Sequence, residues 1–167
     1  MKKMTVNFMT RTALLLALTM VVQSLRLQPT ITGPLVNFML IFSTLLVGTA
    51  GGVFIGSITP WIALTVGILN PVLAPAVPFI MLGNAVFCLL AGLAANKNSY
   101  LQFIAIIGGA VLKFGVIAGA AAFILKLPEP VTQVLMFPQL TNALIGGLVA
   151  AKSVQVLKER TRLQSFI

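Results

Sequence analysis

Long apolar runs alternate with short polar segments along almost the whole chain. Six runs cover about residues 9–25, 35–48, 51–69, 78–95, 101–125 and 132–152. Because a helix rises about 1.5 Å per residue, about 20 apolar residues cross the hydrocarbon core of a bilayer, and several of the runs reach this length. The pattern predicts an all-α membrane protein, with six transmembrane helices in a single compact bundle and one domain over residues 1–167.

The segments between the runs differ in kind. Residues 26–34 and 70–78 contain several prolines and predict irregular loops, whereas residues 48–51, GTAG, predict a tight turn. In the third run, Pro60 removes a backbone hydrogen bond and is expected to kink or interrupt the helix. Membrane helices tolerate such a proline where protein or a cavity satisfies the freed carbonyl. The basic residues 152–167 predict a solvated tail.

The charges predict an orientation. The net charge is +9, but the basic residues are scattered over ends and loops and form no nucleic-acid-binding face. Six spans place both termini on one side of the membrane. The basic residues expected on that side are Lys2, Lys3, Arg11, Lys97, Lys152, Lys158, Arg160 and Arg162. Since the other side holds only Arg26 and Lys126, the positive-inside rule predicts cytoplasmic N- and C-termini.

The first run has a second interpretation. Lys2, Lys3 and Arg11 precede an apolar stretch that ends near the small residue Ser24, as in a signal peptide. We expect the run to be retained, because the remaining runs pair better when it serves as the first span.

Composition argues against catalysis. With 59% hydrophobic residues, 8% charged residues and a mean hydropathy of +1.08, the chain is too apolar for a soluble domain of its length. Histidine is absent, Cys88 is the single cysteine, and the two acids, Glu129 and Glu159, lie beyond the ends of apolar runs. These are the residue types on which most general acid–base and metal chemistry depends. We therefore expect no enzyme, metal site or cofactor.

Lys113 lies near the middle of the fifth run, with roughly a dozen apolar residues on each side. A cation at this depth is costly, and a functional role is the default hypothesis. Neither glutamate is at the right depth to pair with it. The remaining possibilities are loss of the proton, hydrogen bonds to carbonyls and amides, a hydrated cavity, or an anionic group on a ligand. The structural alternative places Lys113 at a helix interface, with its head reaching polar groups.

Other polar side chains fall in the same half of the membrane as Lys113. Those within the runs are Trp61, Asn84, Gln139 and Asn142, and the first outer segment adds Gln28, Thr30, Thr32 and Asn37. They are costly in lipid unless they face inward, and together they suit one cavity for a small molecule. For each amide alone an interhelical hydrogen bond is the commoner case, and Trp61 is also consistent with an aromatic belt.

No source of energy is evident in the chain itself. The segment GGVFIGS at residues 51–57 has glycines at the spacing of a phosphate-binding loop but lacks the lysine and the preceding strand. The spans also contain no Asp, Glu or His, the usual carriers of protons or sodium ions in transporters. Uphill transport would therefore require a partner that supplies the work.

The order of these features resembles the substrate-binding S component of an energy-coupling factor (ECF) vitamin transporter. The matching segments are TRTALLLALTMVVQSL, RLQPTITGPLVN, LVGTAGGVFIGSITP and FPQLTNALIGGLVA. The resemblance implies a multi-pass protein of the prokaryotic cytoplasmic membrane with an outward-facing pocket. It also implies docking of the first helix, through Ala13 and Ala17, onto a T component coupled to two ATPases. The small-xxx-small spacing of these alanines is equally consistent with packing inside the bundle.

The resemblance does not identify the vitamin. The nearly acid-free interior argues mildly against a cationic ligand. Two other functions remain open: a self-sufficient channel or facilitator, which would need a continuous polar path, and a non-transporting membrane scaffold, which would leave Lys113 without a role.

Overall fold

The structure, a computed structural model, describes residues 2–164, with side chains from residue 6 to residue 161. Its elements in chain order are α1 (Lys2–Ser24), α2 (Pro29–Val47), α3 (Thr49–Thr65), the 3-10 helix η1 (Pro71–Ala76), α4 (Val77–Leu93), α5 (Ser99–Phe123), α6 (Glu129–Leu135) and α7 (Phe137–Gln164). Five segments are long and apolar enough to cross a membrane, and α3 is a shorter apolar helix. The prediction of an all-α membrane bundle with six apolar helical segments is confirmed.

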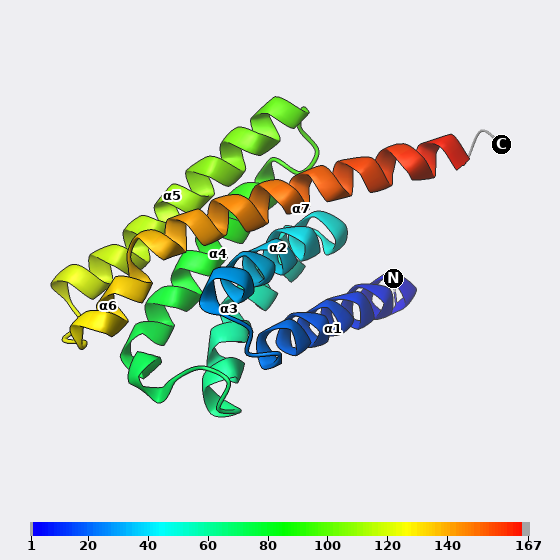
Figure 1. Cartoon of the computed structure of the whole chain (residues 1–167). Coiled ribbons are helices and arrows are strands. Elements are labelled where there is room, and N and C mark those ends of the chain that lie inside the picture. Colours follow the sequence, from blue (N-terminus) through cyan, green and yellow to red (C-terminus); the bar gives the residue numbers. More distant parts are fainter. Residues whose placement is uncertain (1, 165–167) are drawn as a thin grey trace.

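The helices pack side by side, with α7 against α2 and α5, and α4 between α3 and α5 (Figure 1). α1 lies at the edge of the bundle and contacts α2 and α3. α1 begins and α7 ends at the same end of the bundle, which we call the terminal end. The opposite end, where α1 meets α2 and α5 meets α6, is called the cavity end for the reason given below.

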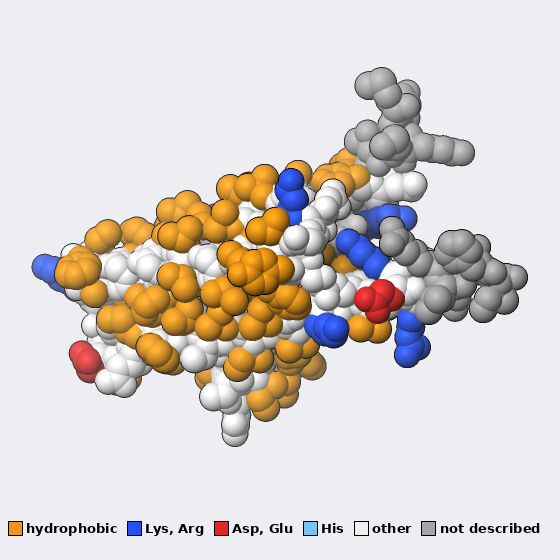
Figure 2. All heavy atoms as spheres, turned by 90° about the horizontal axis from the view of Figure 1, so that it is seen from above, with side chains coloured by type: hydrophobic (Ala, Val, Ile, Leu, Met, Phe, Trp, Pro, Cys, Tyr) orange, Lys and Arg blue, Asp and Glu red, His pale blue; other side chains and the backbone are white. Residues whose placement is uncertain are grey.

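The surface supports the membrane assignment. In the view of Figure 2, hydrophobic side chains cover the middle of the molecule and most Lys and Arg side chains gather at one end. Large apolar side chains such as Phe54, Trp61 and Leu82 are more than half exposed, as expected where lipid rather than water surrounds the helices. Which end faces the cytoplasm remains a prediction from the charge distribution.

Polar and glycine residues set the helix boundaries. Gly48, at φ 94°, is the one residue between α2 and α3, which fits the predicted tight turn because glycine adopts positive φ without a Cβ clash. Asn98 caps α5 by accepting a hydrogen bond from the Leu101 N–H at 2.9 Å. Asn70 accepts one from the Val72 N–H at 3.0 Å and starts η1.

Two predicted boundaries were wrong. The first outer segment is not a loop to residue 34, because α2 already begins at Pro29, whose fixed φ suits the first turn of a helix. The sixth run is divided at Met136 between α6 and α7, and α7 continues as helix to Gln164 where a solvated tail was expected. α3 runs through Pro60 without interruption.

The core consists of three clusters of buried side chains. The largest lies between α2, α4, α5 and α7 and contains Ile41, Leu45, Phe87, Ala91, Ile106, Ala110, Ala143, Ala150, Ala151 and Val154. A second joins α1 to α4 through Leu15, Leu40, Ile55 and Cys88. The third, Ala76, Ile117, Ala121 and Leu135, packs η1 and α6 onto α5 at the cavity end.

Candidate functional site

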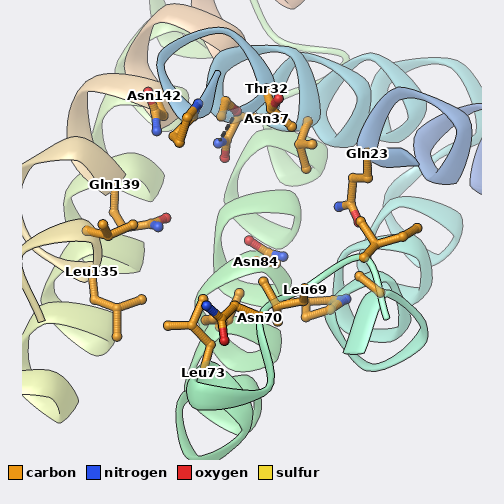
Figure 3. A pocket seen from close by; sticks show the side chains of 18 of the residues that line it. Gln23, Thr32, Asn37, Leu69, Asn70, Leu73, Asn84, Leu135, Gln139 and Asn142 are labelled. Carbon is orange, nitrogen blue, oxygen red and sulfur yellow. Dashed lines mark hydrogen bonds between the residues drawn. The ribbon is translucent and has the colours of Figure 1, made fainter. Parts of the chain in front are cut away.

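A cavity of about 700 Å³ lies at the cavity end, between the last turn of α1 and helices α2 to α7. This volume is typical of sites for small organic molecules. Its polar lining residues are Gln23, Arg26, Thr32, Asn37, Asn70, Asn84, Lys113, Gln139 and Asn142. Figure 3 shows Gln23 and Gln139 entering from opposite sides, with Asn84 between them. Leu69, Leu73 and Leu135 contribute apolar wall.

Lys113 lies at the inner part of this cavity, on α5, with only 3% of its surface exposed. Its Nζ donates a hydrogen bond of 2.5 Å to Oδ1 of Asn37 on α2. Nζ also lies 5.5 Å from the centroid of the Phe87 ring, within the range of a cation–π contact. Of the ways in which the sequence could accommodate Lys113, the structure shows a hydrogen bond to an amide at the inner part of a cavity.

Asn37 has a fixed orientation. Its Nδ2 donates to the carbonyl oxygen of Gly33 at 2.8 Å, so its Oδ1 is the atom left to face the ammonium. Carbonyl oxygens accept and ammonium groups donate, and the opposite placement of the amide atoms would therefore break both bonds. One asparagine thus joins the backbone of α2 to the lysine of α5.

Asn84 explains how α3 tolerates its proline. Because Pro60 has no N–H, the carbonyl of Gly56, four residues earlier, loses its helical partner. Nδ2 of Asn84, on α4, donates to that carbonyl at 3.1 Å. Within residues 2–164, the Oδ1 of Asn84 has no hydrogen-bond partner although it is buried. The side chain therefore borders the cavity with an oxygen that is unpaired but covered by the protein.

Thr32, Gln139 and Asn142 also line the cavity and are half-buried. Asn142 approaches α2 closely, because a Cβ on Gly33 would overlap its amide group. Gln139 and Asn142 lie about one turn apart on α7, which places both amides on the same face of that helix.

Two candidate residues are not brought to the cavity. Trp61 is 53% exposed on the outer surface of α3. Pro60 and Ala63 face the cavity, and the side chain of Trp61 points away from it because each residue turns a helix by about 100°. The expectation that it lines the pocket was wrong. Gln28 is exposed at the start of α2 and likewise lies outside the lining.

Ala13 and Ala17 are both exposed on α1. The buried side of α1 carries Thr12, Leu15 and Thr19 instead. The two alanines therefore face away from the bundle, which disfavours the alternative that they serve internal packing.

Three cavity-lining residues, Gln23, Arg26 and Asn70, were not predicted from the sequence. Arg26 has φ 46° and donates from its guanidinium to the carbonyl oxygen of Gly67 at 2.7 Å, which ties the α1–α2 connection to the end of α3. Gln23 was overlooked because it ends an apolar run. Its position one turn before Arg26 was the available signal.

Apolar packing separates the cavity from the terminal end. On α2 and α5, a fully buried isoleucine lies one turn or more from the polar residue of the cavity, on the side of the terminal end. Ile41 follows Asn37 on α2, and Ile106 precedes Lys113 on α5. Phe87 and Gly147 complete this layer, and a Cβ on Gly147 would lie 2.9 Å from the Phe87 ring. A close-packed apolar layer thus closes the inner end of the cavity, and buried polar side chains such as Ser43, Thr44 and Gln102 lie beyond it, with Gln102 bonded to Gln155.

A helical membrane protein with a polar cavity that is closed at its inner end by packed apolar side chains has the architecture of a protein that binds a small solute within the bundle. Comparison with known families agrees. The family model described as "ECF transporter, substrate-specific component" matches residues 7–157, and the chain belongs to this family. The resemblance drawn from the sequence is confirmed. No curated protein and no solved structure gave a match.

Proposed function

We propose that this chain is the substrate-capturing subunit of an ECF-type importer. It binds a vitamin or similar small micronutrient in the cavity from outside the cell, through contacts from Thr32, Asn37, Asn84, Lys113, Gln139 and Asn142. In this proposal the chain lies in the prokaryotic cytoplasmic membrane with both termini in the cytoplasm, as the distribution of Lys and Arg predicts.

The main support for solute capture is the cavity itself, which ends at close-packed side chains. Its volume of about 700 Å³ suits a small molecule, and Phe87, Ile106 and Ile41 beyond it are fully buried. A channel needs a continuous polar path, and a packed layer of Phe and Ile provides none. The arrangement therefore favours a binding protein over a self-sufficient channel or facilitator.

Energy for uphill transport would come from partners. The chain lacks a nucleotide-binding loop, and its family supplies substrate specificity to ECF transporters. The exposed pair Ala13 and Ala17 offers a smooth helix surface that another helix can approach closely. We assign this surface to the T component, which in turn would couple the chain to two ATPases.

The test is to identify a bound solute. The protein is purified in mild detergent from cells grown in rich medium, examined by native mass spectrometry, and then denatured so that released molecules can be identified. A small molecule bound one to one supports capture. A chain that stays empty, including after incubation with vitamins and their precursors, would favour a scaffold instead.

A separate experiment, with the purified chain in lipid vesicles, tests whether the chain alone lets the solute cross the membrane. We expect vesicles that contain this chain alone to retain the identified solute as well as protein-free vesicles do. Leakage that depends on the chain would overturn the binding-subunit proposal in favour of a facilitator.

A further inference from the structure

The cavity carries an excess of positive charge. Lys113 lies at its inner part and Arg26 at its edge, whereas no Asp or Glu is among the lining residues. The two carboxylates of the chain are both exposed: Glu129 begins α6 and Glu159 lies in the last turns of α7. Neither neutralises a buried ammonium in the middle of α5.

The two cations have different surroundings. Arg26 is exposed, and its guanidinium already bonds the carbonyl of Gly67. Lys113 is 97% buried by difference from its exposed fraction of 3%, and Asn37 is the one side-chain acceptor that the described part of the chain gives it. An ammonium has three donors, so the neutral amide of Asn37 leaves both the charge and further N–H groups unmatched. A buried charge without a counterion is strongly unfavourable.

The position of Lys113 is imposed by close packing. A Cβ on Gly83 of α4 would lie 3.2 Å from Cγ of Lys113, so the glycine lets the lysine stem pass close to α4. The next residue along α4 is Asn84, whose buried Oδ1 has no partner within the described chain. A cation and an unpaired acceptor therefore border the same cavity.

A second unpaired acceptor lies across the cavity. The buried Oε1 of Gln23 also has no hydrogen-bond partner among the residues that the structure describes. Gln23 and Asn84 thus both line the cavity, but their unpaired oxygen atoms are covered by the protein and are not open to a bound molecule in this arrangement.

We propose that the captured solute is an organic anion whose carboxylate or phosphate group binds Nζ of Lys113 beside Asn37. This inference rests on the proposed function and names the chemical class of its substrate. A cavity of about 700 Å³ lined by several amides is too large for a simple inorganic ion and suits a molecule with a polar organic body. The anionic group neutralises Lys113.

The experiment separates solutes by charge before their identity is known. A water-soluble extract of cells is divided at pH 7 by an anion-exchange resin into a retained and an unretained fraction, and the lipids are extracted separately. Each fraction is added to the detergent-purified, ligand-depleted protein. Thermal unfolding is followed with a thiol-reactive dye, because Cys88 is free and buried until the helices separate.

We expect only the retained fraction to raise the melting temperature, by about 5 °C or more near saturation. Lys113→Met removes the cation, and its melting temperature should not respond to that fraction. Lys126→Met, which removes an exposed lysine, is the matched control and should respond as the wild type does. Lys113→Arg keeps the charge and should recover part of the shift, which guards against loss of response by misfolding.

The outcomes are distinguishable. Stabilisation by the unretained fraction alone would overturn the anion inference and leave solute capture intact. Stabilisation of Lys113→Met equal to that of the wild type would overturn the role of Lys113. A response to lipids alone would identify the anion as a lipid headgroup and overturn the inference of a free solute. No response to any fraction would overturn the proposed function itself.

Discussion

Nζ of Lys113 donates a hydrogen bond to Oδ1 of Asn37, although 76 positions separate the two residues along the chain. The bond joins α5 to α2 across the inner part of the cavity. Asn37 holds the lysine in place without neutralising it, since an amide carries no charge. This difference between holding a cation and neutralising it leads to the first prediction.

Replacing Asn37 with aspartate supplies an internal counterion. In the Asn37→Asp variant the carboxylate keeps the acceptor towards Lys113 and adds the missing negative charge, but it loses the bond that Nδ2 donates to the Gly33 carbonyl. Because the new ion pair offsets the lost bond, we expect the empty protein to remain folded with a melting temperature close to that of the wild type. Affinity for the captured anion should fall at least tenfold, about 1.4 kcal/mol, because the ligand then competes with a built-in carboxylate. Titration calorimetry with the identified solute measures this. An affinity that is unchanged or higher would contradict an anionic contact at Lys113.

The second prediction concerns Asn84 and Pro60. Asn84→Leu leaves the buried carbonyl of Gly56 without a partner, and we expect a loss of about 1–3 kcal/mol of stability. Pro60→Ala restores a backbone N–H that can bond the same carbonyl within α3. Asn84→Leu should therefore cost less in the Pro60→Ala background than alone. A double-mutant cycle of melting temperatures measures the coupling, and strictly additive effects would contradict this account.

Much of the fold was predictable because membrane insertion imposes a strong constraint on sequence. Backbone polar groups must be satisfied within each span, so apolar runs of the required length become helices, and all six runs did. The turn at Gly48 followed from glycine's tolerance of positive φ. One error came from proline, because Pro29 was assigned to a loop although it starts α2. Pro60 leaves α3 uninterrupted, and Asn84 satisfies the carbonyl that this proline frees.

The cavity was only partly predictable. The depth of a residue in the membrane can be counted along each apolar run. This count correctly placed Asn84, Lys113 and Asn142 around one cavity. The direction in which a side chain points was less accessible: Trp61 lies at a similar depth but faces outward, because one residue turns a helix by about 100°. The pairing of Lys113 with Asn37 depends on how α2 and α5 pack, and no local pattern encodes that.

A third prediction tests a close contact between the backbones of α7 and α2. A Cβ on Gly146 of α7 would overlap the carbonyl oxygen of Pro34 and lie 2.6 Å from the backbone nitrogen of Phe38 on α2. Backbone atoms cannot move aside as a side chain can, so Gly146→Ala should destabilise the protein by about 1–3 kcal/mol. Gly108→Ala is the control, because no atom lies within 4 Å of its added Cβ, and it should be neutral or slightly stabilising. Equal melting temperatures for the two variants would contradict this packing.

The last prediction concerns the partner surface on α1. Ala13 and Ala17 are exposed on the side of the helix away from the bundle, so larger residues there are accommodated in the isolated protein. Ala17→Phe should therefore keep its melting temperature and its solute binding but block the close approach of a partner helix, and uptake into cells should fall at least tenfold. Leu18→Phe adds bulk to an exposed neighbour that faces a different direction, about 100° around the helix, and should retain most uptake. Loss of solute binding in Ala17→Phe would instead place Ala17 within the packing that shapes the cavity, and normal uptake would exclude this surface from the contact with the T component.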